Sequence, residues 1–114
     1  ELSLVKRVVK LVTPAVVHIE ATPSPRYQGL LNIEGAGSGV ITQFGSRYVV
    51  LTNRHVIRHS TAERIDIHLA DGRVLHPLRI WDDKDTDVAV MAIDAPNLVA
   101  AHTAPQKESH AACA

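Results

Sequence analysis

An apolar repeat at the start of the chain predicts a short amphipathic helix. Through residues 2–12 apolar side chains recur at helical spacing, with positive side chains between them. Pro14 predicts the end of this helix, because the residue before a proline avoids the helical backbone region. We interpret the positive side chains as a solvated helix face rather than a phosphate or lipid site. The apolar positions are Leu2, Val5, Val9 and Val12, and the positive ones are Lys6, Arg7 and Lys10.

Beyond Pro14 the pattern changes to alternating apolar and polar positions, which predicts β-strands. In residues 15–21, for example, Val17, Ile19 and Ala21 fall on one face. Six strands are predicted, at residues 15–21, 40–43, 47–52, 64–69, 73–81 and 87–94.

Turn-forming residues separate these strands. Gly45 and the pair Asp71-Gly72 predict hairpins, and Pro77 indicates an edge position or a bulge in the fifth strand. Residues 22–34 read as a surface loop and residues 82–86 as a polar turn.

Residues 53–61 read as an irregular segment. Ser60 and Glu63 match a helix capping box. The alternation that follows them has the period of a strand, and we therefore favour a strand there.

Six short strands without crossover helices predict an all-β fold, a small antiparallel barrel preceded by a short helix. We assign residues 1–101 to this barrel. Residues 102–114 have no apolar period, and we expect a disordered tail.

Length, charge and composition exclude several classes of function. A chain of 114 residues suits one compact domain. Its formal net charge of zero argues against electrostatic binding to nucleic acid or anionic lipid. The longest apolar run, residues 88–93, is too short to span a membrane. Cys113 is the single cysteine, so no disulfide forms within the chain.

His55 and Asp87 are the candidate catalytic residues. A histidine at the exit of an apolar strand can face a cleft and serve as a general base. A carboxylate at the entrance of another strand can hold its imidazole. Taken singly, His55 is equally well an ordinary core or surface histidine, and Asp87 simply the last aspartate of a polar turn.

The residues that flank His55 and Asp87 favour a catalytic role for both over an ordinary structural one. TNRHV (residues 52–56) and TDVAV (residues 86–90) resemble the histidine and aspartate motifs of trypsin-like serine proteases of the HtrA (Deg) kind. GSGV (37–40), LADGR (69–73) and TPAVV (13–17) also resemble segments of that family, in matching order. The resemblance covers residues 4–100.

This resemblance implies a chymotrypsin-like fold of two six-stranded barrels, with the active site between them. The first barrel would supply His55 as general base and Asp87 as its orienting carboxylate. The family's nucleophilic serine, its oxyanion hole and its substrate pocket would belong to the second barrel. The nucleophile is therefore expected to be absent from this chain, as is any PDZ domain.

Three further motifs are weaker. Ser38 lies in GAGSG (35–39), which lacks the spacing of a nucleophile elbow and precedes a strand, so we interpret it as structural. His55 and His59 have a zinc-compatible spacing without the glutamate of a zinc-protease motif. The same glycines do not form a dinucleotide fingerprint. We expect no metal and no cofactor.

The resemblance thus implies a serine endopeptidase of the protein quality-control type, truncated before its nucleophile and inactive alone. Its implied partners are unfolded or peptide substrates, the missing second barrel and, in the full-length protein, a homotrimer. Its implied location is outside the cytoplasm, in the periplasm or cell envelope. Two alternatives stay open: a non-catalytic binding or scaffolding module descended from such a protease, and an unrelated barrel with chance motifs.

Overall fold

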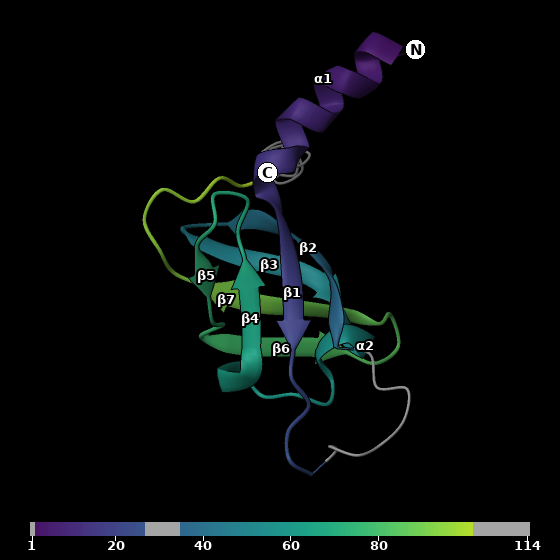
Figure 1. Cartoon of the computed structure of the whole chain (residues 1–114), viewed down its shortest axis with the longest axis vertical. Coiled ribbons are helices and arrows are strands. Elements are labelled where there is room, and N and C mark those ends of the chain that lie inside the picture. Colours follow the sequence, from purple (N-terminus) through teal and green to yellow (C-terminus); the bar gives the residue numbers. More distant parts are fainter. Residues whose placement is uncertain (1, 27–34, 102–114) are drawn as a thin grey trace, which may run out of the picture.

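A seven-stranded antiparallel sheet forms the body of the chain (Figure 1). The computed structural model describes residues 2–26 and 35–101; most of the expected loop and all of the expected tail lie outside them. The order across the sheet is β5-β4-β1-β2-β3-β7-β6. The strands are β1 (Val16–Ala21), β2 (Ala36–Phe44), β3 (Arg47–Asn53), β4 (Ile65–His68), β5 (Val74–Leu75), β6 (Arg79–Asp83) and β7 (Val88–Ile93).

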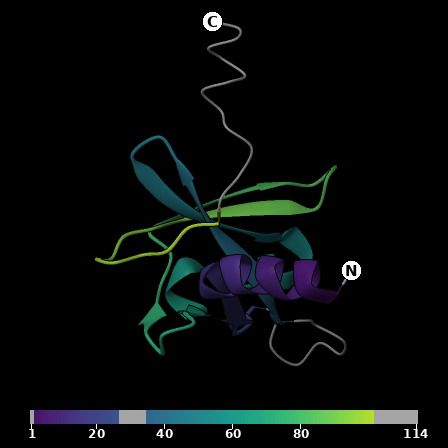
Figure 2. The ribbon, with the colours of Figure 1, turned by 90° about the horizontal axis from the view of Figure 1, so that it is seen from above.

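The expected helix is present as α1 (Leu2–Val12) and continues into the 3₁₀ helix η1 (Thr13–Ala15), which contains Pro14. In Figure 1 α1 extends away from the sheet rather than packing along it, and in Figure 2 the same helix is seen from above, in front of the strands. Five of its large apolar side chains are accordingly exposed, from Val8 at 48% to Leu11 at 74%. No helix in the described part of the chain is long and apolar enough to cross a membrane.

The core lies on one face of the sheet and is aliphatic. The side chains of β1 alternate between exposed and buried, with the predicted positions Val17, Ile19 and Ala21 inside. Ile65 and Ile67 of β4 are buried as predicted, because period two sends alternate side chains to the same face. The core residues are Ala15, Val17, Ile19, Ala21, Ile41, Val50, Val56, Ile57, Ile65, Ile67, Leu69, Ala89, Met91 and Ile93.

The prediction of a single strand at residues 73–81 was wrong, which is why the sheet has seven strands and not six. β5 ends at Leu75 and pairs with β4, whereas β6 begins at Arg79 and pairs with β7. Pro77 lies between them, where its missing N–H prevents a continuous ladder.

This break also explains why the sheet curls. β5 and β6 are the two edges of the sheet, yet only three residues join them. Such a connection spans at most about 15 Å, so the sheet must bend its edges toward each other. The predicted all-β antiparallel fold with a short N-terminal helix is confirmed, and it takes the form of a curled half-barrel, because the two edges do not pair among the described strands.

The segment expected to be irregular, residues 53–61, contains one short helix, and a second follows it directly. The helix α2 (Arg54–Ile57) follows β3 directly, and the 3₁₀ helix η2 (Ala62–Arg64) precedes β4. The capping-box signal at Ser60 and Glu63 therefore marks one tight turn, which has no side-chain cap. β4 then begins at Ile65, in agreement with the alternating pattern.

We expect Ile19→Ala to lower the free energy of unfolding by about 2–5 kcal/mol, because it empties part of a fully buried position. Urea denaturation monitored by circular dichroism measures this change. Val74→Ala is the matched control: Val74 is 47% exposed on an edge strand, and its loss should cost about 0.5 kcal/mol or less. Equal losses in the two variants would contradict the position of the core.

Candidate catalytic site

His55 and Asp87, far apart in sequence, lie side by side. Nδ1 of the His55 ring is 2.5 Å from Oδ2 of Asp87. The backbone N–H of His55 donates to the other carboxylate oxygen, Oδ1, at 2.9 Å. Both oxygens of Asp87 are thus engaged by one residue, and the proximity expected from the two motifs is confirmed.

Strand pairing creates this proximity. β3 ends at Asn53 immediately before α2, and Asp87 immediately precedes β7. β3 and β7 are paired with Asn53 opposite Val88, which sets Asp87 beside the first turn of α2. There the Asp87 carbonyl accepts the backbone N–H of Arg54 at 2.8 Å and the Asn53 side-chain amide at 3.3 Å.

Asp87 itself adopts an uncommon backbone conformation. Its φ is 59°, in the left-handed region that aspartate tolerates better than most residues. The prediction that Asp87 opens the last strand was therefore wrong by one residue: the strand begins at Val88, and Asp87 closes the preceding turn. A hydrogen bond from the Thr86 hydroxyl to Asp83 at 2.8 Å ties that turn together.

The surroundings favour an ionised Asp87. The hydrogen bond from the His55 ring has the largest effect and lowers the pKa of the Asp87 carboxyl. Burial opposes it, whereas the His55 backbone N–H and the charges of His55 and Arg54 lower the pKa further. The two side chains are half-exposed, at 44% for His55 and 43% for Asp87. Arg54 also pairs with Asp82, with Nε 2.9 Å from Oδ2.

Buried neighbours fix α2 to the sheet. Val56 and Ile57 are 5% and 3% exposed and belong to the core. Gly37 of β2 lies directly beneath Val56, since a Cβ added to Gly37 would lie 2.7 Å from the Val56 side chain. The first glycine of the GSGV segment, Gly37, thus leaves room for Val56, the residue next to His55. This contact is a physical reason for a glycine at that position of the motif.

The other sequence candidates fall elsewhere. Ser38 lies within β2 opposite His18, and its carbonyl accepts the Thr52 hydroxyl at 2.8 Å. It is not at a strand-to-helix turn. His59 lies beyond the end of α2 at Ile57, so His55 and His59 do not share one helix face.

Sequence reasoning missed the roles of Asn53 and Arg54 in holding the Asp87 carbonyl. Their place beside His55 in the TNRHV motif was a signal, but the group that they hold is a backbone carbonyl, and a carbonyl leaves no side-chain pattern in the sequence.

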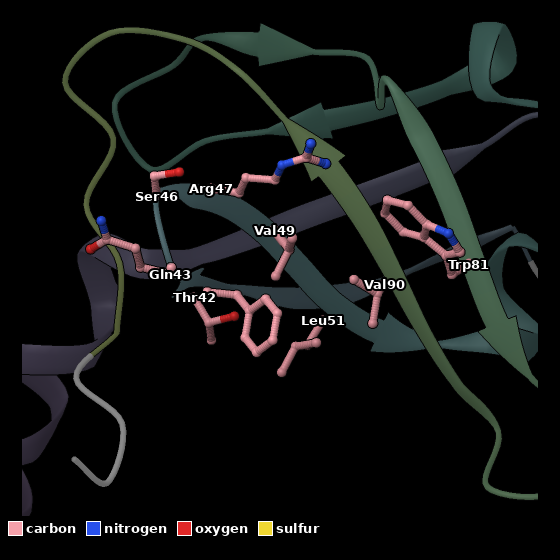
Figure 3. Close-up of a pocket in the computed structure, with 10 residues that line it drawn as sticks. Thr42, Gln43, Ser46, Arg47, Val49, Leu51, Trp81 and Val90 are labelled. Atoms are coloured by element: carbon pink, nitrogen blue, oxygen red, sulfur yellow. The ribbon is translucent and has the colours of Figure 1, made fainter. Parts of the chain in front are cut away.

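An apolar groove of about 1130 Å³ lies on the outward face of the sheet, where residues 42–47 of the β2–β3 hairpin line it together with β3, β7 and β6. Figure 3 shows Val49, Leu51 and Val90 on the same side of the sheet, with Trp81 flanking them. Cross-strand pairing explains the row, because Leu51 lies opposite Val90 and Val90 opposite Trp81. Leu51 and Trp81 are 39% and 41% exposed. Hydrophobic side chains therefore line both faces of this part of the sheet.

The sequence of this chain is similar to those of known serine endoproteases. The chain is 38% identical to the serine endoprotease DegS of Salmonella typhimurium over 88 residues, which cover 76% of this chain and 24% of DegS. It is 44% identical over 64 residues to the periplasmic pH-dependent serine endoprotease DegQ of Escherichia coli, covering 56% of this chain and 13% of DegQ.

A solved structure agrees with these sequence matches. The serine endoprotease from Yersinia pestis superposes with a TM-score of 0.63 at 34% identity, over 83% of this chain and 31% of the other. The chain spans about a quarter of the length of DegS. No protein-family model matches it.

Proposed function

The chain is a distant homologue of the HtrA/Deg serine endoproteases over most of its length, and from this we propose that it is the base-carrying half of a serine endopeptidase. The observation that carries the proposal is the hydrogen bond between His55 Nδ1 and Asp87 Oδ2. An imidazole held at Nδ1 by an ionised carboxylate leaves Nε2 as the nitrogen that exchanges protons with a nucleophile.

In this mechanism His55 accepts the proton of a serine hydroxyl as that oxygen attacks a peptide carbonyl. The same proton then passes to the departing amine. Asp87 holds the ring in the tautomer with its proton on Nδ1 and stabilises the imidazolium formed between the two transfers. The half-exposed position of both side chains suits a partner that approaches from outside the half-barrel.

The nucleophile is assigned to a second barrel. Five of the six serines of this chain do not have a glycine on both sides, and Ser38, which does, lies within β2 rather than at a strand-to-helix turn. We place the second barrel against the apolar groove, because Leu51 and Val90 lie one alternation along their strands from Asn53 and Val88, beside the His55–Asp87 pair. Burying such a groove removes apolar surface from water, and patches of this kind mark interaction sites.

Replacing Trp81 with serine is expected to weaken binding of the second barrel by at least about tenfold, because a large side chain at the groove loses its apolar contact. Titration of the wild-type and variant chains with a purified second barrel of a relative measures this affinity.

Val74→Ser is the control for this titration. Val74 is also exposed, but it lies on the edge strand β5, outside the groove. Equal weakening by the two substitutions, or none by Trp81→Ser, would contradict docking in the groove.

By extension from the relatives, we propose unfolded polypeptides as substrates, a homotrimeric full-length protein and a location outside the cytoplasm. The name of DegQ specifies the periplasm, which supports the last of these for this chain.

A binding or scaffolding module is the second candidate, favoured by the same groove, which could hold a partner without catalysis. Co-expression with a second protease barrel distinguishes the two functions, because only the protease half restores cleavage that depends on His55.

A further inference from the structure

A second cluster of ionisable side chains lies on the outward face of β1 and β4. Antiparallel pairing sets His18 opposite His68 and Glu20 opposite Asp66. Residues two apart in a strand share a face, so these four side chains form a two-by-two grid. They are accessible, with exposed fractions from 38% for His68 to 57% for Glu20.

The distances within the grid approach those of a metal centre. His68 Nε2 is 3.0 Å from Glu20 Oε1, and His18 Nε2 is 3.8 Å from Glu20 Oε2. Glu20, Asp66 and His68 each offer a ligand atom within 4.8 Å of the other two. Ligand atoms around a tetrahedral zinc ion are about 3.3 Å apart. Small rotations of exposed side chains would close the difference.

The distance between the two histidine rings is also close to that of two imidazoles bound to one metal ion. The ring centroids of His18 and His68 are 6.0 Å apart and inclined at 45°. Two imidazoles bound to one zinc ion through Nε2 have centroids about 5 Å apart. The rings therefore need to approach by roughly one ångström, without a change of strand register.

A fifth residue, His76, lies beside Asp66 of the cluster. His76 Nδ1 is 3.4 Å from Asp66 Oδ1 and 2.9 Å from the carbonyl of Ile65. Outer contacts of this kind fix the orientation of a ligating carboxylate and tune its affinity for a metal.

We propose that His18, Glu20, Asp66 and His68 form a binding site for a divalent transition metal of the zinc class. Two imidazoles with two carboxylates suit zinc, whereas magnesium and calcium prefer oxygen ligands alone. The two carboxylates supply the negative charge that balances the ion. A bound metal would link β1 to β4 through side chains, in addition to their backbone ladder.

Calorimetric titration of the full chain with zinc chloride tests the proposal. We expect one zinc ion per chain, no heat of binding with magnesium or calcium, and the visible absorption of a tetrahedral site with cobalt(II). Absence of zinc binding, or binding of calcium with equal affinity, would overturn it.

Variants locate the site. His68→Gln is expected to lower zinc affinity by at least about 100-fold and His76→Gln by about tenfold, since outer-shell contacts contribute about 10- to 100-fold. His55→Gln removes an imidazole outside the cluster and should leave affinity unchanged. The double variant His102→Gln/His110→Gln, at positions outside the described residues, should also leave it unchanged.

Far-ultraviolet circular dichroism confirms that each variant is folded before titration. If zinc affinity follows His55 or the two later histidines instead of His68, the metal lies elsewhere and the assignment is wrong. Because binding is measured on the chain alone, the result does not depend on whether it is half of a protease.

Discussion

Co-expressed with the second barrel of a homologous protease, this chain is expected to restore cleavage of an unfolded protein, whereas neither half alone should cleave it. His55 and Asp87 activate a nucleophile and cannot replace one. Loss of the serine from such a triad costs on the order of a million-fold in turnover. Each lost donor of the oxyanion hole costs roughly a further hundred- to thousand-fold. Cleavage of fluorescein-labelled casein, followed by release of small fragments, measures the restored activity.

Substitutions in the restored pair show which residue carries the chemistry. His55→Ala should abolish cleavage, whereas His59→Ala, which removes a nearby histidine outside the site, should retain it. Cleavage by the purified chain alone that survives His55→Ala would show that the catalytic site has been misidentified.

Asp87→Asn in the reconstituted enzyme is expected to lower turnover by about 10⁴-fold, the magnitude known for the trypsin-like triad. Asparagine can keep the left-handed backbone and accept the His55 N–H through its oxygen. Its amide group, however, would donate toward His55 Nδ1 and so favour the wrong tautomer. Rates of peptide cleavage at saturating substrate measure this loss.

Folding serves as the control for this variant, because the amide should change catalysis far more than stability. Urea denaturation near neutral pH should show that Asp87→Asn is folded, with a midpoint lowered only by the small stabilisation that the ionised Asp87 contributes. A variant that loses activity only in proportion to its unfolded fraction would assign Asp87 a structural role.

The pH dependence of stability has a defined sign. The pKa of Asp87 is lower in the folded chain than in the unfolded one, mainly because of the His55 ring hydrogen bond. Its stabilising contribution is therefore present above the unfolded pKa of about 3.9 and is lost as the pH falls through the lower folded value. Any stability difference between wild type and Asp87→Asn should shrink on acidification below about pH 4.

Much of the fold could be predicted from the alternation of apolar and polar residues and from the turn-forming residues. Period two identified the buried faces of β1 and β4, and the pair of motifs placed His55 beside Asp87. Such signals work because side-chain burial and hydrogen bonding act on the same residues that the pattern displays.

What sequence reasoning missed depends on contacts between segments. Pro77 indicated an edge position or a bulge, but nothing in residues 73–81 showed that the chain changes partner there from β4 to β7. The grid of His18, Glu20, Asp66 and His68 could not be seen either, because each pair has strand spacing but only the β1–β4 register joins them.

Within residues 2–26 and 35–101 the two edges of the half-barrel are unpaired, and this affects how the protein associates in concentrated solution. An open strand edge invites pairing with another chain and the growth of fibrils. Here β5 has only two residues, and β6 carries Arg79, Asp82 and Asp83 along its five. Short length on one side and charge on the other discourage edge-to-edge polymerisation. Self-association, where it occurs, should therefore proceed through the sheet face and give small, soluble, salt-tolerant complexes instead of amyloid.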